Sequence, residues 1–283
     1  MLCSRMAQSF QKTHKEREMK KLFAFVSVLV LASMVLAACA PAVAPVPGAP
    51  AAGGLPDLGG KAVTVAVENA YPPFNSIDEA SGQGVGWDYD TVTEICKRVN
   101  CKPEFKQAAW DGIFPAMQAG EFDVLADGVT LTEERAKIVD FSTPYVQVGQ
   151  VLLTRVDETR DLATFKTDAA AKVGTQIGTT NEIVAKSTFA DKDIQSFEDF
   201  GAAVLALIAG DIDAVVVDNV SASGYIKENA GKLKIADQIT SDEKLAFVFP
   251  PKSEFKAAFD AALAAMQADG TLDALNKKWG LTQ

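Results

Sequence analysis

Arg135 is the residue of this chain best suited to hold a carboxylate. It ends the string Thr132-Glu133-Glu134-Arg135, and its planar guanidinium can bind both oxygens of a carboxylate at once. The alternative for the same residue is an exposed helical arginine that pairs with Glu133 or Glu134. The first interpretation predicts a site for a small molecule that carries a carboxylate.

A second anion-binding feature is expected at Thr179 and Thr180, which follow Gly178 at the predicted start of a helix. Free backbone amides and the helix dipole favour an anion at such a position. A plain N-cap is the alternative, and the two roles are compatible. We therefore include both threonines among the predicted ligand-binding residues.

Asp218 is an acidic residue that directly follows four apolar ones, in the string AVVVD at 214–218. A carboxylate in such surroundings is costly unless it is paired. Its partner is either a cation of the ligand or a basic side chain in a salt bridge at a loop. An α-amino acid, which carries a carboxylate and an ammonium on one carbon, needs a cation and an anion held a few ångströms apart.

Composition excludes several classes of function. The chain of 283 residues has a net charge of −10, whereas a nucleic-acid-binding protein needs a basic face. Its one histidine, His14, lies in the N-terminal leader described next. Without that histidine the protein has no imidazole base, no Ser-His triad and no imidazole metal ligand. The sequence also lacks a GxGxxG or GxxxxGK[ST] phosphate loop, and we expect neither cofactor nor metal.

The first 38 residues resemble a bacterial lipoprotein signal peptide. Lys20 and Lys21 precede an apolar run from Leu22 to Ala38, which ends in the string LAAC at Cys39. The resemblance implies that Cys39 becomes the lipidated first residue of the mature protein. A single transmembrane anchor is the alternative, although a run of about 17 residues is of borderline length for it.

Polar residues 16–18 are unusual in front of a signal peptide, so we expect translation to start at Met19 and residues 1–18 not to be translated. Removal of residues 1–38 takes away six basic and two acidic residues, which makes the net charge −14.

Residues 39–60 are rich in Ala, Pro and Gly and predict a flexible tether between the lipid anchor and the folded part.

Strands and helices alternate from Lys61 onward. Hydrophobic periodicity and expected caps at Asp111 and Thr132 predict strands at 63–67, 104–107, 123–126, 172–176 and 214–217, and helices at 92–99, 111–120, 180–187, 198–209, 255–266 and 272–279. Regular alternation predicts a mostly parallel sheet with helices on both faces. Ligands of such sheets lie at the carboxyl ends of the strands.

Seven strings along the chain are similar to one family in their order as well as their content. They are YPPF at 71–74, GWDYD at 86–90, WDGIFPAMQAGEFDV at 110–124, TLTEERAKIVDFSTPY at 130–145, GTT at 178–180, AGDIDAVVVD at 209–218 and ADGTLDALNKKWG at 268–280. Over nearly all of residues 61–283 the sequence resembles bacterial extracellular solute-binding protein family 3, the periplasmic polar amino-acid-binding proteins of ABC transporters.

The resemblance implies an α/β, two-lobed periplasmic-binding-protein fold of type II. Each lobe is expected to be a mostly parallel sheet flanked by helices, and two hinge strands join the lobes. Lobe 1 is predicted to comprise 61–148 and 245–283, and lobe 2 to comprise 149–244. A ligand between the lobes closes them by a hinge motion, and the closed form docks on the membrane permease.

The resemblance also implies roles for the candidate residues. Arg135 binds the ligand carboxylate, with the hydroxyl of Thr130 and the backbone of Gly128 assisting. Thr180 contributes to the same end of the ligand. Asp218 binds the ligand ammonium.

Four further residues concern the ligand side chain. Tyr71 and Trp110 match positions whose rings sandwich that side chain, although core packing is the alternative for any aromatic residue. Glu68 matches an acid that faces the side chain, and Asp127 replaces the small residue usual in the family. Two acids favour a basic ligand such as arginine, lysine, ornithine or histidine. Asp127 can instead point away and bond a backbone amide, and one acid suits glutamine equally well.

Cys96 and Cys101 remain after Cys3 and Cys39 are assigned to the leader and the lipid site. Outside the cytoplasm a disulfide is permitted, and it would close a short turn between a helix end and a strand. Two reduced core cysteines are the alternative. We predict the disulfide.

These inferences predict a non-enzymatic, extracytoplasmic substrate-binding subunit of an amino-acid ABC importer. It is expected to be a lipid-anchored monomer whose partners are a polar, preferentially basic, amino acid and the permease. The alternatives are the binding domain of a sensor and an enzyme of the same fold that resembles cyclohexadienyl dehydratase.

Overall fold

A computed structural model describes residues 54–190 and 192–281 of the chain. The predicted leader at 1–38, the lipidation site Cys39 and the tether up to residue 53 lie outside the described residues. Within the described part, no helix is long and apolar enough to cross a membrane.

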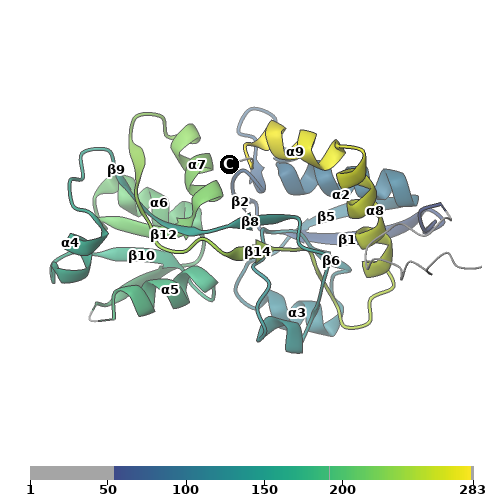
Figure 1. Ribbon diagram of the computed structural model, residues 1–283, viewed down its shortest axis with the longest axis horizontal. Helices are drawn as coiled ribbons and strands as arrows, with labels where there is room; N and C mark the ends of the chain where they lie inside the picture. Colours follow the sequence, from purple (N-terminus) through teal and green to yellow (C-terminus); the bar gives the residue numbers. More distant parts are fainter. Residues whose placement is uncertain (1–53, 191, 282–283) are drawn as a thin grey trace, which may run out of the picture. The chain divides into compact units, whose positions relative to one another are not determined.

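The described chain forms two five-stranded sheets with helices around them (Figure 1). The first sheet has the order β5-β1-β6-β15-β7. Its strands are β1 (Lys61–Val67), β5 (Cys101–Gln107), β6 (Val124–Leu125), β7 (Asp140–Phe141) and β15 (Val248–Phe249). The pairs of β1 with β5 and β6 are parallel, whereas those of β15 with β6 and β7 are antiparallel.

The second sheet repeats this plan in the order β11-β10-β12-β9-β13. Its strands are β9 (Gln150–Arg155), β10 (Val173–Gln176), β11 (Ile194–Phe197), β12 (Ala214–Asp218) and β13 (Leu233–Gln238). β10 pairs in parallel with β11 and β12, and β9 runs antiparallel to β12 and β13. The two-lobed fold is therefore confirmed. In each sheet four strands run in one direction, as expected of a mostly parallel sheet, and one strand, β15 in the first and β9 in the second, runs opposite to its neighbours.

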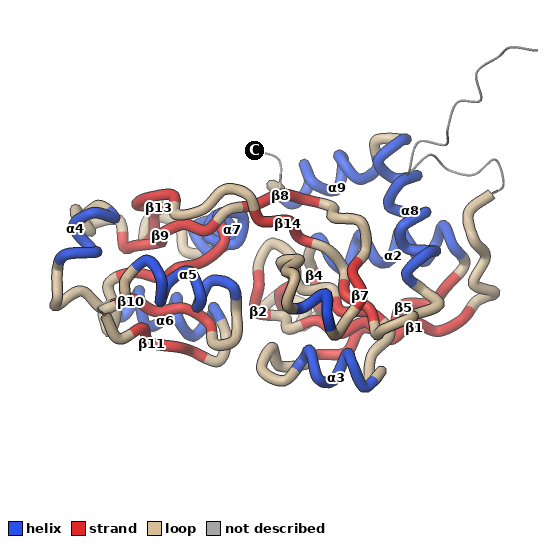
Figure 2. The backbone as a smooth tube through the Cα atoms, turned by 60° about the horizontal axis from the view of Figure 1, so that its bottom comes forward, coloured by secondary structure: helices blue, strands red, loops and turns tan. Residues whose placement is uncertain are grey.

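Helices pack against both sheets (Figure 2). Those that accompany the first sheet are α2 (Trp87–Val99), α3 (Ile113–Ala119), α8 (Lys256–Ala268), α9 (Thr271–Trp279) and the single 3-10 turn η1 (Arg135–Lys137). Those of the second are α4 (Leu162–Thr167), α5 (Thr180–Thr188), α6 (Phe200–Ala209) and α7 (Asn219–Glu228). The short strands β2 (Ala70–Tyr71), β3 (Asn75–Ile77) and β4 (Gly84–Val85) form a separate meander.

Two antiparallel strands, β8 (Val146–Val148) and β14 (Glu243–Leu245), run between the two sheets (Figure 1). They match the two hinge strands that the family resemblance implies. Val148 leads directly into the second sheet through Gly149, and Leu245 leads back toward β15. Gly149 has no room for a side chain, because a Cβ there would lie 2.0 Å from the carbonyl oxygen of Thr240.

The expected elements are present, but several begin at other residues: α2 begins at Trp87 rather than 92, and β5 at Cys101 rather than 104. Asp111 does not cap its helix: α3 begins after Gly112, which has φ 81° and no side-chain cap, and Asp111 is exposed. The helix expected from 198 begins at Phe200, because the side chain of Asp199 accepts from the Ala202 amide at 2.7 Å. The helix that Thr132 was expected to cap is only the short 3-10 turn η1, whose N-cap is Glu134, although the Thr132 hydroxyl does accept from the Arg135 amide at 3.2 Å.

Residues 55–60, which the sequence analysis included in the tether, contact the first lobe. Leu55 and Leu58 pack against the hydrophobic core. The Leu58 amide donates to the Val99 carbonyl at 2.8 Å, and Asn100 donates to Asp57 at 2.7 Å.

The predicted disulfide is confirmed: Cys96 and Cys101 are bonded. Cys96 lies near the end of α2 and Cys101 begins β5, so the bond closes the turn between a helix and a strand. Asn100, with φ 54°, forms that turn.

Replacing both cysteines by serine should lower the free energy of unfolding by about 2 kcal/mol, because the bond closes a loop of only about five residues and restricts the unfolded chain correspondingly little. Urea unfolding of the double variant measures this loss. Ligand affinity should be unchanged, because the bond lies outside the pocket. A loss above about 4 kcal/mol or a change in affinity would contradict this account.

Candidate functional site

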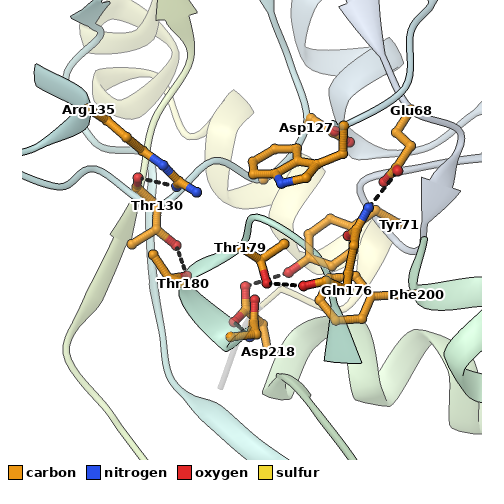
Figure 3. Close-up of a pocket in the computed structure, with 13 residues that line it drawn as sticks. Glu68, Tyr71, Asp127, Thr130, Arg135, Gln176, Thr179, Thr180, Phe200 and Asp218 are labelled. Atoms are coloured by element: carbon orange, nitrogen blue, oxygen red, sulfur yellow. Dashed lines mark hydrogen bonds between the residues drawn. The ribbon is translucent and has the colours of Figure 1, made fainter. Parts of the chain in front are cut away.

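One pocket gathers the side chains that the sequence predicts for ligand binding (Figure 3). The predicted residues that line it are Glu68, Tyr71, Trp110, Asp127, Gly128, Thr130, Arg135, Thr179, Thr180 and Asp218, together with Gln176, Asn181 and Phe200, which the sequence analysis did not select. Their participation in ligand binding stays a prediction.

The ends of four strands position the acidic and amide side chains. Glu68 follows β1, Asp127 follows β6, β10 ends at Gln176 and β12 ends at Asp218. In each sheet these strands are parallel, so their carboxyl ends reach the same edge. The expectation drawn from strand order is therefore met in both sheets.

Arg135 supplies the cation of the pocket. Its Nη1 donates to the Thr130 carbonyl at 2.9 Å, and its guanidinium carbon lies 5.2 Å from the Trp110 ring centre and 4.6 Å from that of Phe114. No carboxylate lies within ion-pair distance of it in the part of the chain that the structure describes, so the alternative of a pair with Glu133 or Glu134 is not observed. Burial lowers the pKa of Arg135 to about 10, which leaves the side chain charged at neutral pH.

Thr179 and Thr180 have different roles at the start of α5. The Thr179 hydroxyl accepts from the Glu182 amide at 3.1 Å and donates to the Gln176 carbonyl at 2.7 Å. Thr179 is thus the N-cap, and its hydroxyl is fully used. The hydroxyl of Thr180, by contrast, lies 3.3 Å from that of Thr130 and bridges the two lobes.

Asp218 is 2% exposed and forms no ion pair with any described basic residue. It accepts hydrogen bonds from the Tyr71 hydroxyl and, at 2.9 Å, from the Asn181 amide. Burial raises the pKa of Asp218 to about 6. The alternative of a salt bridge at a loop is therefore not observed, and the acid is hydrogen-bonded without being neutralised.

The two predicted aromatic residues both pack against other rings and line the pocket. Tyr71 stacks between Phe74 and Phe200, with ring centres 5.5 and 5.4 Å away, and Phe74 is fully buried. Trp110 meets Phe114 edge to face. For each of them, pocket lining and core packing are compatible.

Gly128 contributes by lacking a side chain. Its φ is +54°, and a Cβ there would lie 2.6 Å from a ring carbon of Tyr71. Any other residue would be strained and would displace the Tyr71 ring. The chain therefore needs a glycine here whether or not its backbone contacts a ligand.

Glu68 and Asp127 lie at the end of the pocket opposite Arg135 (Figure 3). Glu68 accepts from the Gln176 side-chain amide at 2.6 Å. Asp127 accepts from the Asn75 side-chain amide at 2.7 Å. Burial raises the pKa of both carboxyls, and the proximity of Asp127 raises that of Glu68 further.

The Asn75 amide also holds a third acid. Its other hydrogen bond, at 2.9 Å, goes to Asp88 on α2, whose second oxygen is buried without a partner. Burial raises the pKa of Asp88 to about 8. Asp127 thus accepts from the Asn75 side-chain amide, which also donates to Asp88. The alternative for Asp127 was a hydrogen bond to a backbone amide away from the ligand. Asp127 is indeed held by an amide, but by that of a side chain, and it also lines the pocket.

The pocket therefore has one buried cation at one end and carboxyls at the other, and none of them forms an ion pair with another described residue. Among the described residues, no group of three His, Cys, Asp or Glu side chains could hold a metal ion. The arrangement can bind a molecule with an anionic end and a cationic end.

The sequence analysis missed three pocket residues, and only one of them had a sequence signal that could have identified it. Gln176 ends a strand that the sequence did predict, so its position at a carboxyl end was a usable signal. Asn181 and Phe200 lie in the first turns of α5 and α6, where polar and aromatic residues are common for other reasons.

The buried acids make stability fall as pH rises. The folded chain holds a proton on Asp88 up to about pH 8, whereas the unfolded chain loses it near 3.8. The folded state binds more protons between these values, so the free energy of unfolding should decrease with pH, by at most about 1.4 kcal/mol per pH unit for each such carboxyl. Asp88→Asn should make this slope shallower between pH 5 and 8 in urea unfolding.

Asp111→Asn is the matched control, because Asp111 is exposed and should leave the slope as in the parent. An Asp88→Asn protein with the parent slope would show that Asp88 is ionised in the folded state throughout this range.

Comparison with known proteins finds similarity to amino-acid-binding proteins. The chain is 30% identical to the L-cystine-binding protein TcyJ of Escherichia coli (strain K12) over 217 residues, which cover 76% of this chain and 81% of that protein. An ancestral arginine-binding protein, solved with arginine and with glutamine, is 38% identical, has a TM-score of 0.71 and matches 77% of this chain and 97% of its own.

A third relative is the arginine-, lysine- and histidine-binding protein ArtJ of Geobacillus stearothermophilus, with 31% identity, a TM-score of 0.72 and 79% and 96% of the two chains covered. The model of bacterial extracellular solute-binding proteins, family 3, matches residues 63–282. The resemblance stated from the seven strings is thereby confirmed, and the chain belongs to this family of solute-binding proteins.

Proposed function

We propose that this protein is the extracytoplasmic substrate-binding subunit of an amino-acid ABC importer and that it binds a basic amino acid between its two lobes. The observation that carries the proposal is the charge distribution of the pocket. Among the described residues Arg135 has no ion-pair partner, and Asp218 and Glu68 accept hydrogen bonds but have no cation beside them. A ligand with a carboxylate, an ammonium and a cationic side chain supplies each missing partner.

The α-carboxylate of the ligand faces Arg135. A guanidinium without a carboxylate partner can bind it bidentately, and the Thr130 and Thr180 hydroxyls lie 3.3 Å apart beside it. The α-ammonium faces Asp218, which Tyr71 and Asn181 hold in place. The two charged groups affect each other, since Arg135 lowers the pKa of Asp218, as expected for charges that a single zwitterion can bridge.

The ligand side chain extends toward Glu68 and Asp127. Burial of two carboxyls is unfavourable in their charged forms, and a guanidinium or ammonium group would stabilise those forms. The rings of Tyr71 and Trp110 add an attraction for a cation of roughly 0.5–2 kcal/mol. Relatives named for arginine, lysine and histidine support this ligand class, whereas those named for cystine or solved with glutamine support a neutral polar ligand.

Binding rather than catalysis is the function that these contacts favour. The acids that could act as a general acid are each held by an amide donor, Gln176 for Glu68 and Asn75 for Asp127.

The partner that the family implies is an ABC-transporter permease. We further propose that the monomeric protein is attached to the membrane through a lipid on Cys39, on the strength of the sequence pattern around that residue.

A thermal-shift panel tests the ligand class. The purified protein, freed of co-purified ligand by unfolding, dialysis and refolding, is mixed with the proteinogenic amino acids, ornithine and prephenate. A ligand at 1,000 times its Kd adds about 4 kcal/mol of stability, or several degrees in Tm. We expect shifts with arginine, lysine, ornithine or histidine. A shift with prephenate alone would favour the dehydratase alternative, and no shift at all would refute amino-acid binding.

Arg135→Ala should weaken binding of the amino acid identified in that panel by about 2–5 kcal/mol, because it leaves a buried carboxylate unpaired. This loss corresponds to roughly 30-fold to 3,000-fold in Kd, measured by isothermal titration calorimetry. Lys137→Ala, which removes an exposed cation from the same 3-10 turn, is the control and should bind as the parent does. Parent affinity in Arg135→Ala would refute the carboxylate assignment.

Glu68→Gln separates the two ligand classes. The substitution keeps the shape of the side chain and an acceptor for Gln176, but it removes the charge that faces a cationic side chain. We expect arginine affinity to fall at least about 10-fold, in line with charge-assisted hydrogen bonds, and glutamine affinity to change less than about 3-fold. Equal losses for both ligands would contradict the proposed preference for a basic side chain.

A further inference from the structure

Glu243, on the hinge strand β14, brings an unassigned carboxylate to the carboxylate-binding end of the site. It is half-buried, and no lysine or arginine nitrogen of the described chain lies within ion-pair distance of it. The sequence analysis assigned no role to this residue. Its charge nevertheless affects Arg135: burial lowers the pKa of Arg135, and the negative charge of Glu243 raises it.

Two short hydrogen bonds hold the Glu243 carboxylate in place. Oε1 accepts from the Thr240 hydroxyl at 2.7 Å, and Oε2 accepts from the Gln150 side-chain amide at 3.0 Å. Gln150 is fully buried at the start of β9. The carboxylate is thus fixed by the hinge region itself, independently of any ligand.

Two longer contacts connect the same oxygen to both lobes. Oε2 lies 3.4 Å from the hydroxyl of Thr130 and 3.4 Å from that of Thr180. These distances exceed the usual 2.5–3.0 Å of a hydroxyl hydrogen bond, so both contacts are weak and easily released. Each hydroxyl has one hydrogen to donate, and a hydrogen directed at Glu243 is not available to a ligand.

We propose that Glu243 is an affinity- and specificity-determining residue that competes with the ligand α-carboxylate for the Thr130 and Thr180 hydroxyls and repels that carboxylate. This inference rests on the proposed function. It assigns to the hinge strand a direct electrostatic influence on the ligand, beyond its role in joining the lobes.

A distance argument bounds the repulsion. A ligand oxygen that accepts from Thr130 at an ordinary distance of about 2.7 Å can be no farther from Glu243 Oε2 than the sum of that distance and the observed 3.4 Å, or about 6 Å. Two like charges at that separation change a binding constant by roughly 3-fold in a water-like dielectric and roughly 100-fold in a protein-like one. Glu243 therefore weakens the binding of any ligand that carries a carboxylate at this end.

Glu243→Gln isolates this effect because it removes the charge and can keep the two anchoring bonds. The amide oxygen can accept from Gln150, and the new amide hydrogens can be donated to the Thr240 hydroxyl, which is able to accept. Asp242→Asn is the matched control, since it makes the same change at the adjacent, exposed residue of the same segment.

Isothermal titration calorimetry with L-arginine and with L-argininamide tests the proposal on the full chain. In argininamide the α-carboxylate is a neutral carboxamide, which has no charge for Glu243 to repel. Glu243→Gln should bind L-arginine roughly 3-fold to 100-fold more tightly than the parent, and argininamide within about 3-fold. The Kd ratio of amide to acid should therefore rise in this variant and stay constant in Asp242→Asn. L-glutamine and L-glutaminamide serve as a second pair of probes.

Unchanged or weaker L-arginine binding by Glu243→Gln, in a protein whose parent does bind it, would overturn this inference and leave the proposed function standing. A parent that binds no amino acid would overturn the proposed function and this inference with it. If circular dichroism shows that Glu243→Gln is unfolded, Glu243→Asp gives the same test, because a shorter side chain withdraws the charge from both threonines. Its expected gain in affinity is smaller, roughly 2-fold to 10-fold.

Discussion

Charged groups that are removed from water need partners, and this requirement organises the pocket. Within the described chain, Arg135 lies against two aromatic rings without a carboxylate partner, and Asp218 lies at the end of a fully buried strand without a cation. Burying a charged group without a partner is costly. In the proposed function, a ligand that brings the opposite charges recovers this cost, which makes the unpaired charges a source of binding free energy.

Amide side chains keep the acids in place without adding a positive charge beside them. Gln176 donates to Glu68 across the lobes, Asn181 donates to Asp218, and Asn75 is shared by Asp88 and Asp127. A lysine or arginine at any of these positions would satisfy the acid and remove its use for a ligand. An amide donates a hydrogen bond to the carboxyl but carries no positive charge, so the carboxyl can still pair with a cationic group of the ligand.

Both lobes contribute to this arrangement because both sheets bring parallel strands to one edge. The antiparallel strands β15 and β9 lie beside these parallel strands, and the hinge strands β8 and β14 pair with each other between the sheets. A carboxylate on β14 can therefore contact threonines of both lobes at the same time. The proposed effect of Glu243 on affinity would therefore come from a strand that also connects the two lobes.

Periodicity predicted most strands and helices from the sequence. The disulfide was predicted because two cysteines remained in a chain expected outside the cytoplasm. Arg135 and Asp218 were found because a planar cation and an acid after an apolar strand are distinctive, whereas most other predicted pocket residues came from the resemblance of the strings to one family. Only the tertiary structure decided that Asp127 bonds Asn75, that Glu68 bonds Gln176 and that Glu243 reaches the two threonines. These pairs are 52, 108, 113 and 63 residues apart in the chain. Hydrogen-bond partners at such separations are chosen by how the lobes and the hinge pack, and no local pattern of residues encodes that choice.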